Sequence, residues 1–201
     1  MRLPMPLVSL RSTVAQGLGL GLRLCEPVCL RLRRFAYEAW ARAHIRGRVE
    51  AGVQFVGPVV VEGTGNIHIG RGTRIGRNVF FETYDKAAIV IGRGVTINDG
   101  VLIAAHSGVD IADMVMVGEY TSIRDANHGM RKGEYVRWQA HECAPVRIGR
   151  DVWIGRGVIV AKGVALEDGA VVGANSMVNK DVPENTIVAG APAKPVGKRS
   201  E

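Results

Sequence analysis

Between Ile69 and Val178, an aliphatic residue recurs every six positions, and a small residue usually follows it. A period of six fits neither an α-helix, which turns by about 100° per residue, nor an alternating strand broken by glycine-rich corners. It predicts a coil with three flat faces, whose aliphatic side chains point inward and stack on their equivalents in neighbouring coils. The series is Ile69, Ile75, Ile91, Ile97, Ile103, Ile111, Val117, Ile123, Ile148, Ile154, Val160, Leu166, Val172 and Val178.

A second positional rule accompanies the first, because glycine or asparagine often stands three residues after the aliphatic position. These two residue types adopt a left-handed backbone conformation most easily, as a tight corner requires. The agreement of two independent rules indicates a repetitive all-β domain. The corner residues are Gly72, Asn78, Gly94, Gly100, Gly157, Gly163, Gly169 and Asn175.

The repeat resembles that of the hexapeptide-repeat acyltransferases over roughly residues 55–196. The resemblance is carried by PVRIGRDVWIG (145–155), GANS (173–176), KDVP (180–183) and GAPAK (190–194). The spacing to Asn127-His128 is most similar to that of the maltose, galactoside and polysaccharide O-acetyltransferases. The resemblance implies a left-handed parallel β-helix and a homotrimer that binds acetyl-CoA between subunits. It also implies a CoA-dependent O-acetyltransferase that acts on a hydroxyl of a sugar or glycan-like acceptor.

Residues 129–145 interrupt the period with a polar stretch that contains Trp138, His141 and Cys143. A loop of this length in a compact repeat fold is usually functional or disordered. The resemblance implies an excursion that embraces a neighbouring subunit and walls the active site. A tolerated surface insertion is the alternative.

His128 stands directly before this interruption, at a position expected to reach the surface. A hydroxyl acceptor loses its proton as it attacks a thioester, and imidazole suits that task at neutral pH. By position, His128 matches the catalytic histidine of the family, and we interpret it as the general base. Asp125 and Glu142 are candidates to orient its ring by proximity, and His106 could contact the acceptor.

Asn98 follows an inward isoleucine, in a slot that small residues usually fill. The attack creates an oxyanion that needs a fixed donor, and by the resemblance Asn98 contacts the acetyl or acceptor end. The alternative is a corner asparagine bonded to its own backbone. The resemblance also implies a CoA groove in which cations bind phosphates, although each cation could instead be a solvated surface residue. The groove residues are Trp153, Arg156, Ala174, Asn179, Lys180 and Lys194.

Residues 1–50 differ in character from the repeat, because they are rich in arginine and contain few acidic residues. A loose helical rhythm over residues 7–46, clearest from Cys25 to Ala43, predicts a basic amphipathic segment. It could pack against the repeat domain (51–196, followed by a tail, 197–201) or lie on an anionic membrane surface. We therefore expect a cytoplasmic protein with possible peripheral contact to the inner face of the membrane, and no nucleic-acid partner.

The sparse cysteines and the absence of His-x4-His spacing argue against a metal centre, including that of a γ-type carbonic anhydrase. A non-catalytic β-helix scaffold would lack the long interruption, His128 and the exit segment. An N- or O-acyltransferase that acts on a small molecule, such as serine, an antibiotic or a nucleotide sugar, remains the main alternative.

Overall fold

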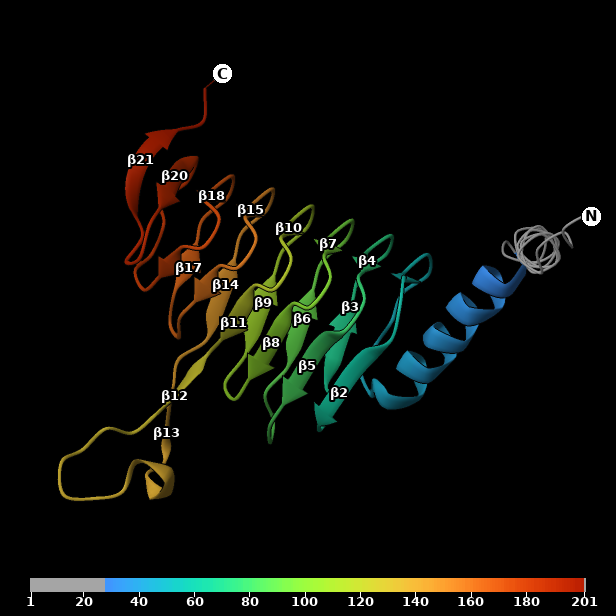
Figure 1. Cartoon of the computed structure of the whole chain (residues 1–201), viewed down its shortest axis with the longest axis horizontal. Helices are drawn as coiled ribbons and strands as arrows, with labels where there is room; N and C mark the ends of the chain where they lie inside the picture. Colours follow the sequence, from blue (N-terminus) through green and yellow to red (C-terminus); the bar gives the residue numbers. More distant parts are fainter. Residues whose placement is uncertain (1–27, 201) are drawn as a thin grey trace, which may run out of the picture. The chain divides into compact units, whose positions relative to one another are not determined.

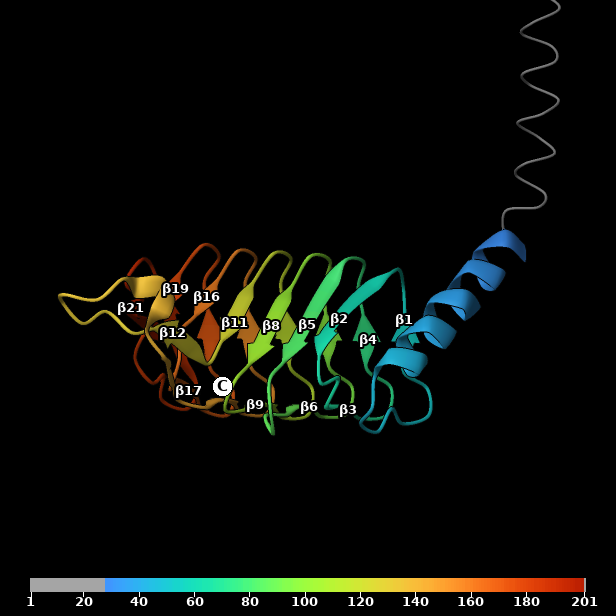
Figure 2. The same ribbon diagram turned by 90° about the horizontal axis from the view of Figure 1, so that it is seen from below.

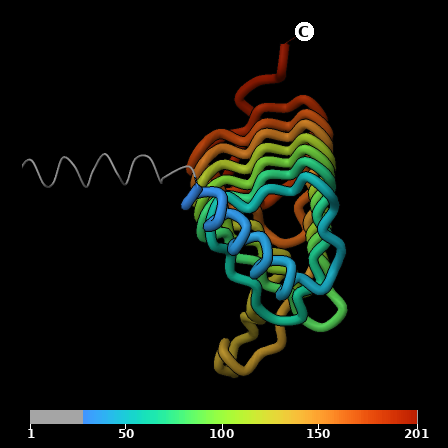
Figure 3. The backbone as a smooth tube through the Cα atoms, turned by 90° about the vertical axis from the view of Figure 1, so that its right-hand side faces the viewer, coloured from blue at the N-terminus to red at the C-terminus, as the bar shows by residue number. Residues whose placement is uncertain are grey.

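The computed structural model describes residues 28–200, and its main body is a stack of β-coils (Figure 1). Seen end-on, successive coils overlay one another (Figure 3). Three parallel sheets form the faces, apart from the antiparallel pair β20–β21.

The first face contains β1 (Gln54–Phe55), β4 (Arg74–Ile75), β7 (Thr96–Ile97), β10 (Met116–Val117), β15 (Trp153–Ile154), β18 (Val171–Val172), β20 (Thr186–Ala189) and β21 (Lys194–Lys198). The second contains β2 (Val59–Gly63), β5 (Val79–Thr83), β8 (Leu102–Ala105), β11 (Ser122–Arg124), β16 (Ile159–Val160) and β19 (Met177–Val178). The third contains β3 (Ile67–Ile69), β6 (Ile89–Ile91), β9 (Val109–Ile111), β14 (Val146–Ile148) and β17 (Ala165–Leu166).

The core consists of the side chains that the six-residue period predicts. Every member of the aliphatic series is at most 2% exposed. Parallel registers such as Ile97 beside Val117 and Val117 beside Ile154 stack equivalent residues from coil to coil. A second buried column, which the six-residue series does not include, lies two residues earlier, at positions such as Val95 and Val152. The predicted left-handed parallel β-helix is confirmed.

The corners adopt the predicted left-handed conformation, with positive φ at all eight of the glycine and asparagine positions. Met114 (φ 63°), Tyr120 (φ 58°) and Asp151 (φ 55°) occupy the same slot, so the geometry of the coil overrides their local preference. The small residue beside each inward side chain has a separate cause. A Cβ at Gly118, for example, would lie 2.5 Å from the backbone nitrogen of Arg156 in the next coil.

A helix spans residues 28–44, and the rest of the expected segment lies outside the described residues. The chain divides into two compact units between Ala36 and Tyr37. In the larger unit, Ala41 and Ile45 are buried in the core and Tyr37 packs against it. In the smaller unit, all residues from Val28 to Ala36 are exposed. No helix within residues 28–200 is long and apolar enough to cross a membrane.

Candidate functional site

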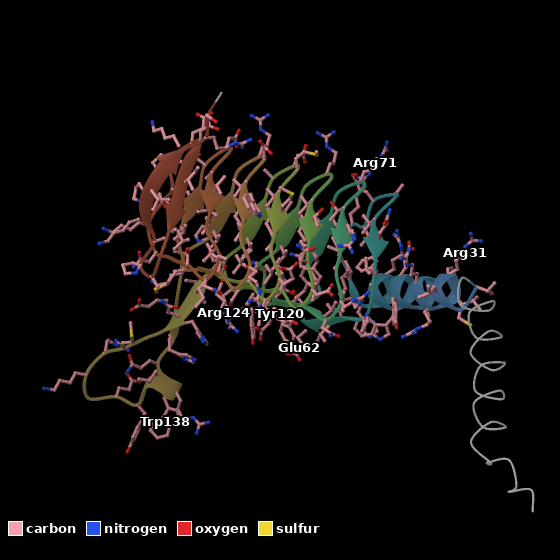
Figure 4. The ribbon with its side chains drawn as sticks, turned by 45° about the horizontal axis from the view of Figure 1, so that its top comes forward. Arg31, Glu62, Arg71, Tyr120, Arg124 and Trp138 are labelled. Atoms are coloured by element: carbon pink, nitrogen blue, oxygen red, sulfur yellow. The ribbon has the colours of Figure 1, made fainter. Side chains whose placement is uncertain are left out.

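The interruption of the repeat is an ordered excursion that leaves and re-enters the same corner of one coil. Its base is an antiparallel ribbon of β12 (Ala126–His128) and β13 (His141–Cys143), and a 3₁₀ turn (Val136–Trp138) lies farther out. Figures 1 and 2 show it projecting from the stack, and Figure 4 shows Trp138 well away from the coils. From the sequence, His128 was expected just before the excursion, at the end of a coil. The ribbon begins at Ala126, however, so His128 belongs to the excursion itself.

Side-chain hydrogen bonds hold the outer part of the excursion in shape. Gln139 is buried, and its side-chain oxygen accepts a hydrogen bond from the backbone N–H of Arg131 at 2.7 Å. Its amide group donates to the carbonyls of Arg131 and Glu134, at 3.0 and 2.9 Å. At the neck, the N–H of Ala144 donates to the carbonyl of Asp125 at 2.9 Å. The excursion is therefore an ordered structural element that can hold side chains in place.

A cleft of about 250 Å³ opens where the ribbon meets the coils, and His128 lines it. Near this cleft, four aromatic rings from three parts of the chain pack on one another in succession. The His128 and His141 ring centroids are 4.4 Å apart, those of His141 and His106 are 4.7 Å apart, and His106 stacks on Tyr84 at 4.0 Å. The other lining residues are Ala104, Arg124, Ala126 and Asn127.

The imidazole of His128 is exposed and forms no hydrogen bond with any residue in the described part of the chain. Neither of the two candidate acids is hydrogen-bonded to it. The Asp125 carboxylate is buried, and Glu142 forms an ion pair with Lys162 at 3.3 Å. In this structure the orientation of His128 therefore comes from neither candidate.

Asp125 is completely buried and organises the corner beneath the cleft. Its carboxylate accepts hydrogen bonds from the backbone N–H groups of His106 (2.8 Å), Ser107 (2.6 Å) and Gly108 (2.6 Å). Charge-assisted bonds of this kind are about twice as strong as neutral ones. Asp125 thus fixes the backbone that carries His106, in the same coil corner from which the excursion starts.

The electrostatics of the cleft favour neutral rings beside His128. Burial lowers the pKa of His141, and the neighbouring His106 and His128 lower it further. A hydrogen bond from its hydroxyl to Glu82 raises the pKa of Tyr84, and burial adds to that increase. Burial and Asp125 raise the pKa of the Cys143 thiol, so at neutral pH this thiol is a poor nucleophile. Imidazole is the group in the cleft best suited to take a proton.

Five of the remaining predicted site residues lie at two edges of the second face, and the other two lie on strands of the first-face sheet. Asn98, Arg156 and Ala174 follow strands of the first face, at the edge where the first and second faces meet. The guanidinium of Arg156 lies over the Tyr120 ring, 5.8 Å from its centroid. Asn179 and Lys180 follow β19, at the edge that also carries His128. Trp153 and Lys194 lie on strands of the first-face sheet, and all these residues except Asn98 are exposed.

Comparisons with known proteins agree with this geometry. The family described as bacterial transferase hexapeptide (six repeats) matches residues 145–180. A putative lipopolysaccharide biosynthesis O-acetyl transferase, WbbJ of Escherichia coli K12, is 32% identical over 70% of this chain and 76% of its own length. The chain belongs to the hexapeptide-repeat acyltransferases.

Two further relatives place this hexapeptide-repeat acyltransferase among the acetyltransferases. The galactoside O-acetyltransferase of E. coli K12 is 34% identical over 68% of this chain and 56% of its own length. A hexapeptide-repeat acetyltransferase of Vibrio cholerae, solved in complex with acetyl coenzyme A, is 31% identical, covers 67% of this chain and 72% of its own, and has a TM-score of 0.59. The predicted family and enzyme class are confirmed.

Nothing in the repeat pattern indicated that His141 would face His128, and it was named only as a residue of the interruption. Its position depends on pairing between two segments that the repeat does not describe. Tyr84 was missed for a similar reason, since it lies at an irregular corner after β5. Among residues 28–200, no group of three or more His, Cys, Asp or Glu side chains is arranged to hold a metal ion.

Proposed function

We propose that this acyltransferase moves an acetyl group from acetyl-CoA to a hydroxyl of a sugar or glycan-like acceptor, with His128 as general base. The observation that carries the proposal is an exposed imidazole, free of hydrogen bonds to the described residues, in a cleft at the base of an ordered excursion. The acetyl-CoA complex of the Vibrio cholerae relative supports the donor. The names of the two E. coli relatives support a saccharide acceptor.

The reaction needs two transfers of the same proton, first from the acceptor hydroxyl to the base and then from the base to the leaving CoA sulfur. An imidazole nitrogen of His128 takes the proton of the acceptor hydroxyl while the hydroxyl oxygen attacks the acetyl carbonyl carbon. The tetrahedral intermediate collapses with cleavage of the carbon–sulfur bond, and the imidazolium returns the proton to the departing CoA sulfur. The products are an acetyl ester and CoA. The proposed role of Asn98 is to donate its side-chain amide to the developing oxyanion.

A direct test is acyl transfer to a panel of hydroxyl acceptors (saccharides and glycans) and amine acceptors (amino sugars and aminoglycosides), with release of the CoA thiol as the readout. Transfer to saccharide hydroxyls supports the proposal. Transfer confined to amines or to serine would favour the alternative of a small-molecule acyltransferase, and hydrolysis without any acceptor dependence would contradict both.

The distribution of the site residues supports a homotrimer with shared sites. His128, Asn179 and Lys180 lie on one edge of the second face, and Asn98, Arg156 and Ala174 lie on the other. Between these edges, the outer side of the face exposes aligned apolar residues, with Ile159 paired in register to Met177. A neighbouring copy that covers this ladder would bring one edge of each kind together around one CoA molecule.

Light scattering is expected to give three times the 21.6 kDa mass of one chain at micromolar concentration. The substitution Ile159→Glu should lower the mass and the transfer rate together, because it buries a charge in the interface. Val90→Glu is a matched control, since Val90 is similarly exposed but lies on the third face. A monomeric wild-type protein, or a trimeric Ile159→Glu variant with full activity, would contradict the shared site.

We also propose that the helix holds the enzyme at an anionic membrane surface on the cytoplasmic side. Val28, Leu32 and Phe35 share a helix face by their spacing and are 59%, 64% and 72% exposed. Arg31 and Arg34 lie between them in sequence. Ala41 and Ile45, which pack into the β-helix, follow a different helical register from these three residues.

The full-length protein is expected to co-sediment with vesicles that contain anionic lipid at low salt, and to be released as salt rises. Replacing Leu32 and Phe35 together by serine should remove this binding and leave transfer to a soluble acceptor unchanged. Replacing Val90, an exposed apolar residue of the third face, by serine is the control. Equal binding to neutral and anionic vesicles, or no loss in the double variant, would rule out the proposed contact.

A further inference from the structure

The antiparallel ribbon places His141 directly opposite His128. The N–H of Gly129 donates to the carbonyl of Ala140 at 3.1 Å. The next pair along the ribbon, His128 and His141, is then of the non-hydrogen-bonded kind, in which facing side chains approach most closely. Their ring centroids are 4.4 Å apart with a 40° tilt, and no other aromatic ring among the described residues packs on His128.

His141 is itself held from its other side. Its ring contacts that of His106 (4.7 Å between centroids, 41° tilt), and His106 stacks on Tyr84. The backbone of His106 is fixed by Asp125, and the hydroxyl of Tyr84 is bonded to Glu82. His141 is exposed to solvent, but its ring packs between the ring of His106 and the imidazole of His128.

We propose that His141 is a positioning residue, whose ring holds the imidazole of His128 in the orientation that proton transfer requires. This inference rests on the proposed function, in which His128 is the base. Because no carboxylate in the described structure orients His128, ring packing takes the place that a hydrogen-bonded acid holds in other general-base sites. Misplacement of a reacting group by about 1 Å can cost about 10²-fold in rate, so a packed ring can have a large effect.

The charges around His141 suit this role. When His128 takes the proton of the acceptor, it becomes a cation, and a second cation against its ring would oppose that step. Burial lowers the pKa of His141, the neighbouring His106 and His128 lower it further, and Glu82 opposes this shift. The shift favours the neutral form of His141, whose ring can lie against the imidazolium without charge repulsion.

The test compares His141→Ala with His141→Phe, because phenylalanine keeps a flat ring and loses the nitrogens. His141→Ala is expected to lower kcat about 10-fold to 100-fold with little change in the KM for acetyl-CoA. His141→Phe should recover most of this loss. The ring resonances of His128, followed by NMR, should move in His141→Ala and return toward their wild-type positions in His141→Phe. His44→Ala is the control, since His44 stacks on Trp40 in the helix.

Three outcomes would overturn the proposal: an unchanged kcat in His141→Ala, a His141→Phe variant as slow as His141→Ala, or a parallel rise in the KM for acetyl-CoA that indicates a collapsed excursion. Failure of the proposed function has a different signature. If His128→Ala retains wild-type activity, His128 is not the base, whatever the His141 variants do. If His128→Ala is inactive and His141→Ala is fully active, only the positioning role is lost.

Discussion

Replacing His128 by alanine is expected to lower the acetyl-transfer rate by about 10²-fold to 10⁴-fold, the usual range for loss of a general base. The variant should fold normally, because the side chain is exposed and forms no hydrogen bond with the described residues. It should also bind acetyl-CoA as tightly as the wild type, since the proposed CoA contacts come from other residues. Transfer rate and acetyl-CoA affinity are measured on the same preparations.

His68→Ala provides the matched control. His68 lies on β3 of the third face and its ring is bonded to Asn66 at 3.1 Å, away from the cleft. Its substitution should leave the transfer rate within a few-fold of wild type. An equal rate loss in both variants would mean that loss of any histidine perturbs the fold, and a His128→Ala rate within a few-fold of wild type would remove the base from the mechanism.

The fold could be predicted from the sequence because each repeat contains the same pattern of inward-facing residues. Each inward position, such as Ile97 or Ile154, is specified by a local rule that the next coil repeats, so a single exception does not change the architecture. Met114 and Tyr120 show the strength of this effect, since neither residue favours the left-handed conformation that it adopts. Burial of the aliphatic columns outweighs such local costs.

The candidate site was predicted less completely, because it is built where the repeat stops. His128 was found through its place before the interruption and its resemblance to the family motif. The facing position of His141 depends on the register of a ribbon whose two strands are separated by residues 129–140. Periodicity carries no information about that register. The roles assigned to Asn98 and to the CoA residues stay predictions.

The N-terminal segment illustrates another limit of sequence patterns. The helical rhythm of residues 7–46 was interpreted as one amphipathic segment that either packs on the repeat domain or lies on a membrane. The residues that enter the core are instead Ala41 and Ile45, with Tyr37 against them. Ala41 and Ile45 are four residues apart, as one helix face requires, but they follow a different register from Val28, Leu32 and Phe35. Because the helix carries two sets of apolar residues, one set can pack on the repeat domain while the other binds a membrane surface.

Asp125 provides a direct test of how the site is built. From the sequence it was a candidate to orient the His128 ring, whereas in the structure its carboxylate stabilises a corner of the coil. Its buried carboxylate accepts the N–H groups of three consecutive residues, His106 to Gly108. Removing the carboxylate in Asp125→Ala leaves these three backbone donors without their acceptor. Each buried backbone donor that is left unsatisfied typically costs about 1–3 kcal/mol.

Asp125→Ala is therefore expected to lower the free energy of unfolding by about 3 kcal/mol or more, as measured by urea denaturation. Asp181→Ala is the matched control: this exposed carboxylate accepts one backbone N–H, that of Ala165 at 2.8 Å, and its loss should cost about 1 kcal/mol or less. Transfer activity should also fall in Asp125→Ala, because the corner that carries His106 loosens and His141 loses the ring against which it packs. Equal stability of the two variants would show that the corner holds without its buried carboxylate. A stable but inactive Asp125→Ala variant would instead indicate that the Asp125 carboxylate takes part in catalysis.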